Sequence, residues 1–233
     1  SAGMAKILRE LEVKSHIEVI PIGVDVHKFQ QATPLSRAEF GFADQDILLV
    51  YAGRIAPEKN INFLLQCFAG IAQLIPNVYL LIIGGGKKQF EEELQDQILQ
   101  LGVTSRVRST GMISYEDIPD YLAMCDIFVT TSVSESFGMS TVEAMGAGLP
   151  IMGIHSTGIS DIVVDGKTGF LSTEDVAAFT AKLTYLCLHP SLRKAMGVAG
   201  REASNQYDIE RTTKILFGHY TRLLHNTKPM KKT

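Results

Sequence analysis

The chain has 233 residues, of which 45% are hydrophobic and 20% are charged, and its formal net charge is −3. These values are typical of a globular protein with one large domain or two small ones. They give no reason to expect nucleic acid as a partner, because there is no basic surplus to meet phosphates, and no apolar run approaches the roughly 20 residues that cross a bilayer.

The cysteines indicate a reducing compartment. Cys67, Cys125 and Cys187 are widely spaced, odd in number, and each lies in an apolar segment. This pattern favours buried thiols over a disulfide framework or a zinc site. Since no signal peptide is visible either, we expect a cytoplasmic protein.

The first half of the chain alternates strand and helix patterns. "SAGMAKILRELEV" predicts an amphipathic helix, and "IEVIPIG" predicts a short strand that runs into a turn. "DILLVYAG" is a continuous apolar run, as expected of a parallel strand buried on both faces. A helix is predicted from about Asn60 to Leu74, then the strand "VYLLIIG" and a helix from about Gln89 to Leu101.

The second half continues the alternation. It predicts a strand at "RVRST", a helix from about Asp117 to Met124, strands at "IFVTTS", "PIMGI" and "GFLS", and three final helices. Strands separated by helices of about 10–15 residues favour an α/β fold with a doubly wound parallel sheet, that is, a Rossmann-like domain. We expect residues 226–233 to form a frayed polar tail, whose lysines would also suit peripheral contact with an anionic membrane.

Three loops are predicted at one edge of this sheet, beyond the carboxyl ends of the strands, where ligands bind in open α/β sheets. Arg54 and Lys59 follow the first buried strand, and a run of three glycines from Gly84 follows the second. Cations, bare backbone and helix N-termini all favour anions. The sequence therefore predicts a ligand that carries phosphate.

The third loop, in "TSVSESFGMSTVEAMGAGLP", carries two acids eight positions apart, Glu135 and Glu143. Ser140 and Glu143 fit a capping box, which would explain Glu143 without any ligand. Glu135 has no such structural role. A sugar would give it one, because carboxylates accept strong hydrogen bonds from paired hydroxyls.

Two other kinds of site fit the sequence less well. A dinucleotide fingerprint requires G-x-G-x-x-G and an acid about 20 residues later, but Gln89 stands where the last glycine belongs and the next strand ends without a carboxylate. Asp44 and Asp46 resemble a metal-binding D-x-D, yet they precede a strand and so lie at the opposite edge. We expect a turn with two solvated acids there, and no metal site.

Four segments then show a family resemblance. "GRIAPEKN", "IIGGG", "ESFGMSTVEAMGAGLP" and "DGKTGFL", in this order, resemble the nucleotide-sugar domain of group 1 retaining glycosyltransferases of the E-x7-E type. The resemblance covers residues 1–233 as one domain, the second, donor-binding domain of the GT-B fold. It implies that an N-terminal acceptor domain precedes Ser1 and that a helix at about 209–225 crosses to it.

The resemblance also implies roles. Arg54 and Lys59 would bind the donor diphosphate and stabilise the leaving group, and Glu135 would hold hydroxyls of the donor sugar, so these three form the expected catalytic set. Preorganised donors of this kind can replace a metal, and no cofactor is expected. The expected substrate-binding residues are Gly53, Arg54, Lys59, Gly84, Met112, Ile113, Glu135, Phe137, Gly138, Met139, Ser140 and Glu143, with Met112 and Ile113 at the base and Glu143 at the ribose.

By this resemblance, the enzyme would move a hexose from a nucleotide diphosphate sugar to an acceptor hydroxyl on a glycan or lipid. We expect the chain alone to bind the donor weakly and to transfer little, and its last helix to favour dimerisation. Two alternatives stay open: an epimerase or phosphorylase of the same fold, and a non-catalytic module that senses nucleotides or carbohydrates.

Overall fold

The computed structural model describes residues 1–226, so most of the expected frayed tail lies outside the described residues. Within them, six strands form one parallel sheet in the order β3-β2-β1-β4-β5-β6, as the sequence predicts. The order reverses between β1 and β4, which pair directly through Leu49 and Ile127. The strands are β1 Ile47–Ala52, β2 Val78–Ile83, β3 Val107–Gly111, β4 Ile127–Thr130, β5 Ile151–Ile154 and β6 Gly169–Ser172.

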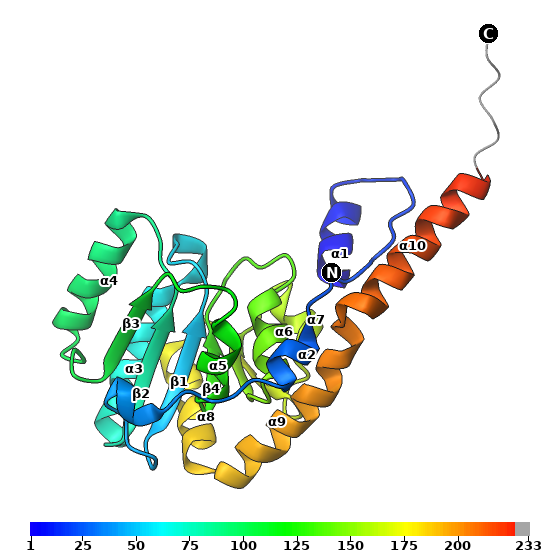
Figure 1. Cartoon of the computed structure of the whole chain (residues 1–233). Coiled ribbons are helices and arrows are strands. Elements are labelled where there is room, and N and C mark those ends of the chain that lie inside the picture. The colour runs from blue at the N-terminus through cyan, green and yellow to red at the C-terminus, as the bar shows by residue number, and fades with distance from the viewer. Residues whose placement is uncertain (227–233) are drawn as a thin grey trace.

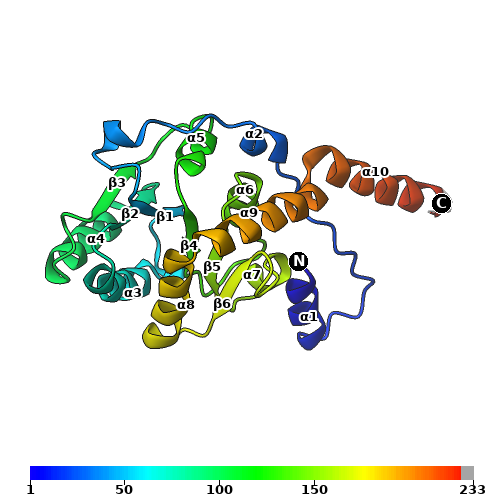
Figure 2. The ribbon, with the colours of Figure 1, turned by 90° about the horizontal axis from the view of Figure 1, so that it is seen from below.

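The strands are buried on both faces because helices cover the sheet on both sides (Figures 1 and 2). Along β1, Leu49 and Tyr51 join the core under α3 (Ile61–Leu74), α4 (Lys88–Gln100) and α8 (Val176–Leu188). Leu48, Val50 and Ala52 join the core on the other face, under α2 (Val26–Gln30), α5 (Ile118–Ala123) and α6 (Met139–Gly146). This two-residue alternation is the geometry of a strand between two apolar layers. The continuous apolar run in the sequence has this cause.

The helices predicted at about 60–74, 89–101, 117–124 and 209–225 agree with the structure to within a residue or two, the first helix ends three residues before the predicted stretch does, and several short helices were not predicted. The longer ones are α1 Ala2–Glu10, α3 Ile61–Leu74, α4 Lys88–Gln100, α6 Met139–Gly146, α8 Val176–Leu188, α9 Pro190–Ser204 and α10 Ile209–Asn226. The short ones are α2 Val26–Gln30, η1 Arg37–Phe40, η2 Pro57–Lys59, α5 Ile118–Ala123, α7 Ile159–Ile162 and η3 Asn205–Tyr207.

The predicted strand at "IEVIPIG" is wrong. Residues 17–23 form no strand, and Val24 makes only an isolated bridge to Asp208. The N–H of Val24 donates to the carbonyl of Tyr207 at 2.9 Å, so the segment leads to the junction of α9 and α10 and not to an edge of the sheet. Pro21, which has no N–H, could not have completed a ladder there.

The last helix projects away from the sheet (Figure 1). α10 leaves Phe217 and Tyr220 largely exposed, and no residue of α1 is buried. The expectations that this helix crosses to another domain, and that it favours dimerisation, stay predictions. No helix within residues 1–226 has the length and apolar content to cross a bilayer.

The predicted turn at Asp44 and Asp46 lies before β1, at the amino edge of the sheet. Asp44 is exposed, but Asp46 is buried and its carboxylate accepts a hydrogen bond from the N–H of Ala43 at 2.8 Å. The prediction of two solvated acids is therefore wrong for Asp46, which stabilises the turn. Cys67, Cys125 and Cys187 are buried free thiols, as the sequence predicts.

Candidate functional site

Two adjoining pockets open at the carboxyl edge of the sheet, where β1 and β4 meet. The apolar pocket has a volume of about 560 Å³ and the polar pocket about 400 Å³. Ala52, Gly53, Arg54, Ser140 and Glu143 line both of them. The apolar pocket takes its character from Ile55, Ile83, Phe90, Met112, Ile113 and Ile118. The switch point of an open α/β sheet is where ligands bind in such folds.

The structure brings every residue predicted from the sequence to these two pockets. Gly53, Arg54, Ser140 and Glu143 line both pockets, Gly84, Met112 and Ile113 line the apolar one, and Lys59, Glu135, Phe137, Gly138 and Met139 line the polar one. Their proximity is thus a property of the fold. Their roles toward a ligand stay predictions.

Lys59 and Glu135 form an ion pair within the polar pocket. Lys59 Nζ lies 2.6 Å from Glu135 Oε2, and the two side chains keep only 17% and 18% of their surface exposed. Lys59 ends η2, and Glu135 lies in the loop between β4 and α6. The bond is short because both partners are charged. It fixes a cation and an acceptor together at one point of the pocket.

Arg54 lies at the border of the two pockets and is much more exposed, at 75% of its side-chain surface. Its Nη2 donates to Glu58 Oε1 at 2.9 Å, four positions further along the chain. Exposed ion pairs of this kind are worth little. The guanidinium can therefore turn to an anion in either pocket at low cost.

The hydroxyl of Thr131 holds the backbone of Lys59 in place. Thr131 is fully buried after β4, and its Oγ1 contacts the carbonyl oxygens of Lys59 at 2.9 Å and Asn60 at 3.0 Å. Asn60 takes a left-handed conformation, with φ 52°, between η2 and α3. The loop that follows β4 thereby stabilises the turn that carries Lys59. Sequence reasoning missed Thr131; its signal was a polar side chain at the end of a buried strand.

Thr131→Val should therefore lower the free energy of unfolding by about 2 kcal/mol, because the single hydroxyl proton that the carbonyls of Lys59 and Asn60 share is lost while the volume is kept. Thr131→Ser keeps the donor and loses one methyl group, which costs only about 1 kcal/mol. Urea unfolding of both variants measures the difference. A Val variant as stable as the Ser variant would show that the hydroxyl does not hold the turn.

The capping-box interpretation of Glu143 is wrong. α6 begins at Met139, after a cap at Gly138 with φ 92° and no side-chain hydrogen bond, so Ser140 is the second helical residue. Helix starts leave N–H groups without intrahelical partners. Within residues 1–226, those of Phe137, Gly138, Met139 and Ser140 donate to no other protein group. All four residues line the polar pocket, and a helix start of this kind suits an anion.

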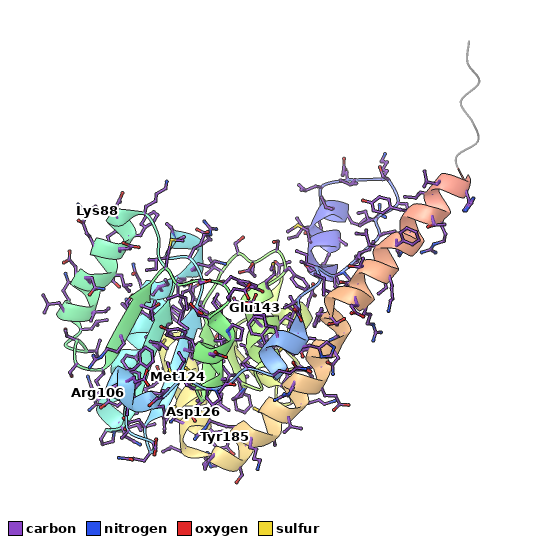
Figure 3. All side chains as sticks on the ribbon, viewed as in Figure 1. Lys88, Arg106, Met124, Asp126, Glu143 and Tyr185 are labelled. Atoms are coloured by element: carbon purple, nitrogen blue, oxygen red, sulfur yellow. The ribbon has the colours of Figure 1, made fainter. Side chains whose placement is uncertain are left out.

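Glu143 is a buried acid on α6, at the carboxyl edge of the sheet (Figure 3). Only 5% of its surface is exposed, and burial raises the pKa of its carboxyl group above the usual value, whereas a hydrogen bond from Tyr115 lowers it. The Tyr115 hydroxyl donates to Glu143 Oε1 at 2.9 Å. Sequence reasoning missed Tyr115, although it follows the predicted base loop directly.

The fold and its edge define a class of protein. A parallel sheet in this order, with an anion-favouring helix start and two acids at the switch point, is a Rossmann-like ligand-binding domain. The model of the family "Glycosyl transferases group 1" matches residues 33–203. The chain belongs to this family of glycosyltransferases.

Curated relatives agree with this assignment. A putative glycosyltransferase, EpsD, from Bacillus subtilis is 29% identical over 86% of this chain and 53% of its own length. A GDP-mannose-dependent alpha-(1-6)-phosphatidylinositol monomannoside mannosyltransferase from Mycolicibacterium smegmatis is 32% identical over 79% of this chain and 50% of its own. The chain thus spans about half the length of the curated relatives it matches.

Solved structures share the fold. A sucrose-phosphate synthase from Thermosynechococcus elongatus superposes with a TM-score of 0.87 at 23% identity, over 97% of this chain and 58% of that one. Anabaena Alr3699/HepE, in complex with UDP-glucose, superposes with a TM-score of 0.78 at 26% identity, over 88% of this chain and 57% of that one. The neighbours are GT-B glycosyltransferases, as the sequence resemblance implies.

Proposed function

We propose that this chain binds the nucleotide diphosphate sugar donor of a retaining hexosyltransferase. The observation that carries the proposal is the meeting, at one edge, of the Lys59–Glu135 pair, the exposed guanidinium of Arg54 and the buried acid Glu143. The cations can bind an anion, the carboxylates can accept hydrogen bonds from a diol, and the adjoining apolar pocket can hold an apolar group. A nucleotide sugar carries all three chemistries in one molecule.

Each of the two pockets holds a different part of such a donor. The apolar pocket takes the base against Met112 and Ile113, and Glu143, on the shared wall, takes the ribose hydroxyls. Arg54 and the N–H groups at the start of α6 take the diphosphate, and the hexose lies in the polar pocket against Glu135. The solved complex of HepE with UDP-glucose and the GDP-mannose named for a mycobacterial relative support a donor of this class.

In transfer, negative charge grows on the departing nucleotide diphosphate. Lys59, which is already held in the polar pocket, and Arg54, once it turns from Glu58 to the diphosphate, would stabilise this charge. Stabilisation by preorganised donors is the largest single contribution in many enzymes. We assign this task to the two side chains and not to a metal. The transfer itself, to a glycan or lipid hydroxyl with retention at the anomeric carbon, belongs to the complete enzyme in which an acceptor-binding domain faces this edge.

Isothermal titration of the chain with UDP, GDP, ADP and NAD, each with Mg²⁺ or with a chelator, tests the donor site. We expect one nucleoside diphosphate to bind with and without Mg²⁺, and Arg54→Ala to weaken it by about tenfold, because hydrogen bonds to charged groups are worth that much. Lys88→Ala is the control, since Lys88 is exposed and pairs with Glu92 outside both pockets. Tighter binding of NAD than of any diphosphate would overturn the proposal.

A further inference from the structure

The carboxylate of Glu143 depends on one neighbour. Tyr115 lies between the apolar loop residue Ile113 and α5, and its hydroxyl donates to Glu143 Oε1 at 2.9 Å. Across residues 1–226, no other group donates a hydrogen bond to this carboxylate. The remaining acceptor capacity, at Oε2 and the second lone pair of Oε1, is free for a ligand.

The ring of Tyr115 is itself held in place from α2. Phe29 packs against it edge to face, with ring centroids 6.3 Å apart and an interplanar angle of 70°. Lys28 Nζ lies 5.2 Å from the ring centroid, and Lys28 also pairs with Glu116. These contacts fix the ring without using the hydroxyl. The hydroxyl is therefore aimed at Glu143 before any ligand arrives.

Burial and the hydrogen bond both act on the protonation of the pair. Burial, with Glu143 beside it, raises the pKa of Tyr115 above its usual range, so the phenol keeps its proton and stays the donor. Its hydrogen bond opposes the effect of burial on the pKa of Glu143, and so favours the ionised carboxylate. Other charged groups that share the pockets with Glu143 or surround Tyr115 are Arg54, Lys59, Lys87, Glu135, Lys28, Glu116 and Asp25.

We propose that Tyr115 is a positioning residue for ribose recognition: it holds the Glu143 carboxylate so that its free lone pairs meet the 2′- and 3′-hydroxyls of the nucleotide. This inference rests on the proposed function, because it deepens the role given to Glu143. An ionised, oriented carboxylate can accept both hydroxyls of a cis-diol. Rotation would lose this alignment, and protonation would remove part of the acceptor capacity and the charge that strengthens both bonds.

The test is a binding cycle with UDP, GDP and ADP and with their 2′-deoxy and 3′-deoxy forms. For the tightest of the three, Tyr115→Phe should weaken binding by about tenfold, the usual worth of a hydrogen bond to a charged group. The penalty for the deoxy forms should be smaller in this variant than in the wild type. In a Glu143→Ala background, which has no side-chain acceptor, Tyr115→Phe should have no further effect, because its hydrogen-bond partner is gone.

The pH profile adds a readout that a merely structural role would not move. Binding needs the ionised carboxylate, so affinity falls as the pH falls through the pKa of Glu143. Without the Tyr115 hydrogen bond this pKa rises, and the midpoint of the acid-side loss should move to higher pH in Tyr115→Phe. Protonation of the nucleotide's phosphates affects binding to the wild type and to Tyr115→Phe equally, so it cancels when the two midpoints are compared.

Tyr121→Phe is the matched control, because Tyr121 packs on Phe40 and lines neither pocket; it should bind as the wild type does. If Tyr115→Phe keeps the wild-type affinity, deoxy penalty and pH midpoint, the inference fails and the proposed function stands. If none of the three nucleotides binds the wild type, both fail. Loss of binding in Tyr115→Phe that persists unchanged in the Glu143→Ala background would show that Tyr115 acts elsewhere, and would also overturn the inference.

Discussion

Under the proposed function, Lys59→Met should lower the turnover of an enzyme that contains this domain by about 10²–10³, the usual effect of removing one preorganised donor from a developing anion. Lys59 Nζ stands 2.6 Å from Glu135 Oε2 in the polar pocket, so the variant also strips a mostly buried carboxylate of its partner. We expect the free energy of unfolding to fall by about 2–3 kcal/mol, at the low end for a broken buried pair because some surface stays wet. Turnover of the donor and urea unfolding measure the two effects.

A double variant separates these effects. Lys59→Met with Glu135→Gln removes both charges, so most of the lost stability should return while turnover stays low. Lys88→Met is the control: that side chain is 87% exposed and pairs with Glu92, so its loss should change stability by less than about 0.5 kcal/mol. Full turnover in Lys59→Met would remove Lys59 from the chemistry. A double variant less stable than either single one would show that the pair is not the cause of the loss.

The parallel sheet could be predicted from the sequence because a strand that is buried on both faces has a continuous apolar run in its own sequence. Runs such as "DILLVYAG" and "VYLLIIG" are largely apolar along their length, and the structure buries them on both faces as β1 and β2. "IEVIPIG" has a similar composition but no adjacent strand to pair with. Strand formation needs a partner as well as apolar side chains, and the partner is set by the path of the chain, which the local pattern does not contain.

Part of the candidate site could likewise be predicted from the sequence, and part could not. Arg54, Lys59, Glu135 and Glu143 could be placed at one edge, because the carboxyl ends of parallel strands meet there. The hydrogen-bond partners of Lys59 and Glu143 could not be predicted. Glu135 is 76 positions from Lys59, and Tyr115 is 28 positions from Glu143. A local motif also allowed a capping box for Glu143, but α6 begins at Met139, so Ser140 is not the cap and Glu143 bonds Tyr115.

Gly84→Ala should be the most damaging single substitution at the glycine loop. Gly84 has φ 126°, and a Cβ there would lie 2.1 Å from the carbonyl oxygen of Gly53. Its own N–H donates to the carbonyl of Gly111 at 3.0 Å, and the N–H of Gly53 donates to the carbonyl of Ile83 at 2.9 Å. The obstacle is therefore backbone that is tied on both sides, not a side chain that can turn away.

The ends of β1 and β2 would have to separate to admit the new atom, and both glycines line the apolar pocket. Overpacking and backbone strain each cost about 1–3 kcal/mol, so we expect at least about 3 kcal/mol of destabilisation. For a chain of this size that lowers the Tm by about 6–12 °C. Nucleotide binding should be lost with it, since the pocket wall is displaced. Calorimetric unfolding and titration measure both.

Gly102→Ala makes the cause of this damage visible. Gly102 also has a positive φ, 69°, but nothing lies within 4 Å of the point that its new methyl group would occupy, so it carries only the left-handed penalty of about 1–2 kcal/mol. In both variants alanine restricts the unfolded chain more than glycine does, so this contribution to stability cancels in the comparison. The excess loss in Gly84→Ala is therefore the cost of parting two strand ends. If the two variants lost equal stability and both still bound nucleotide, the close approach of Gly53 and Gly84 would have no part in shaping the pocket.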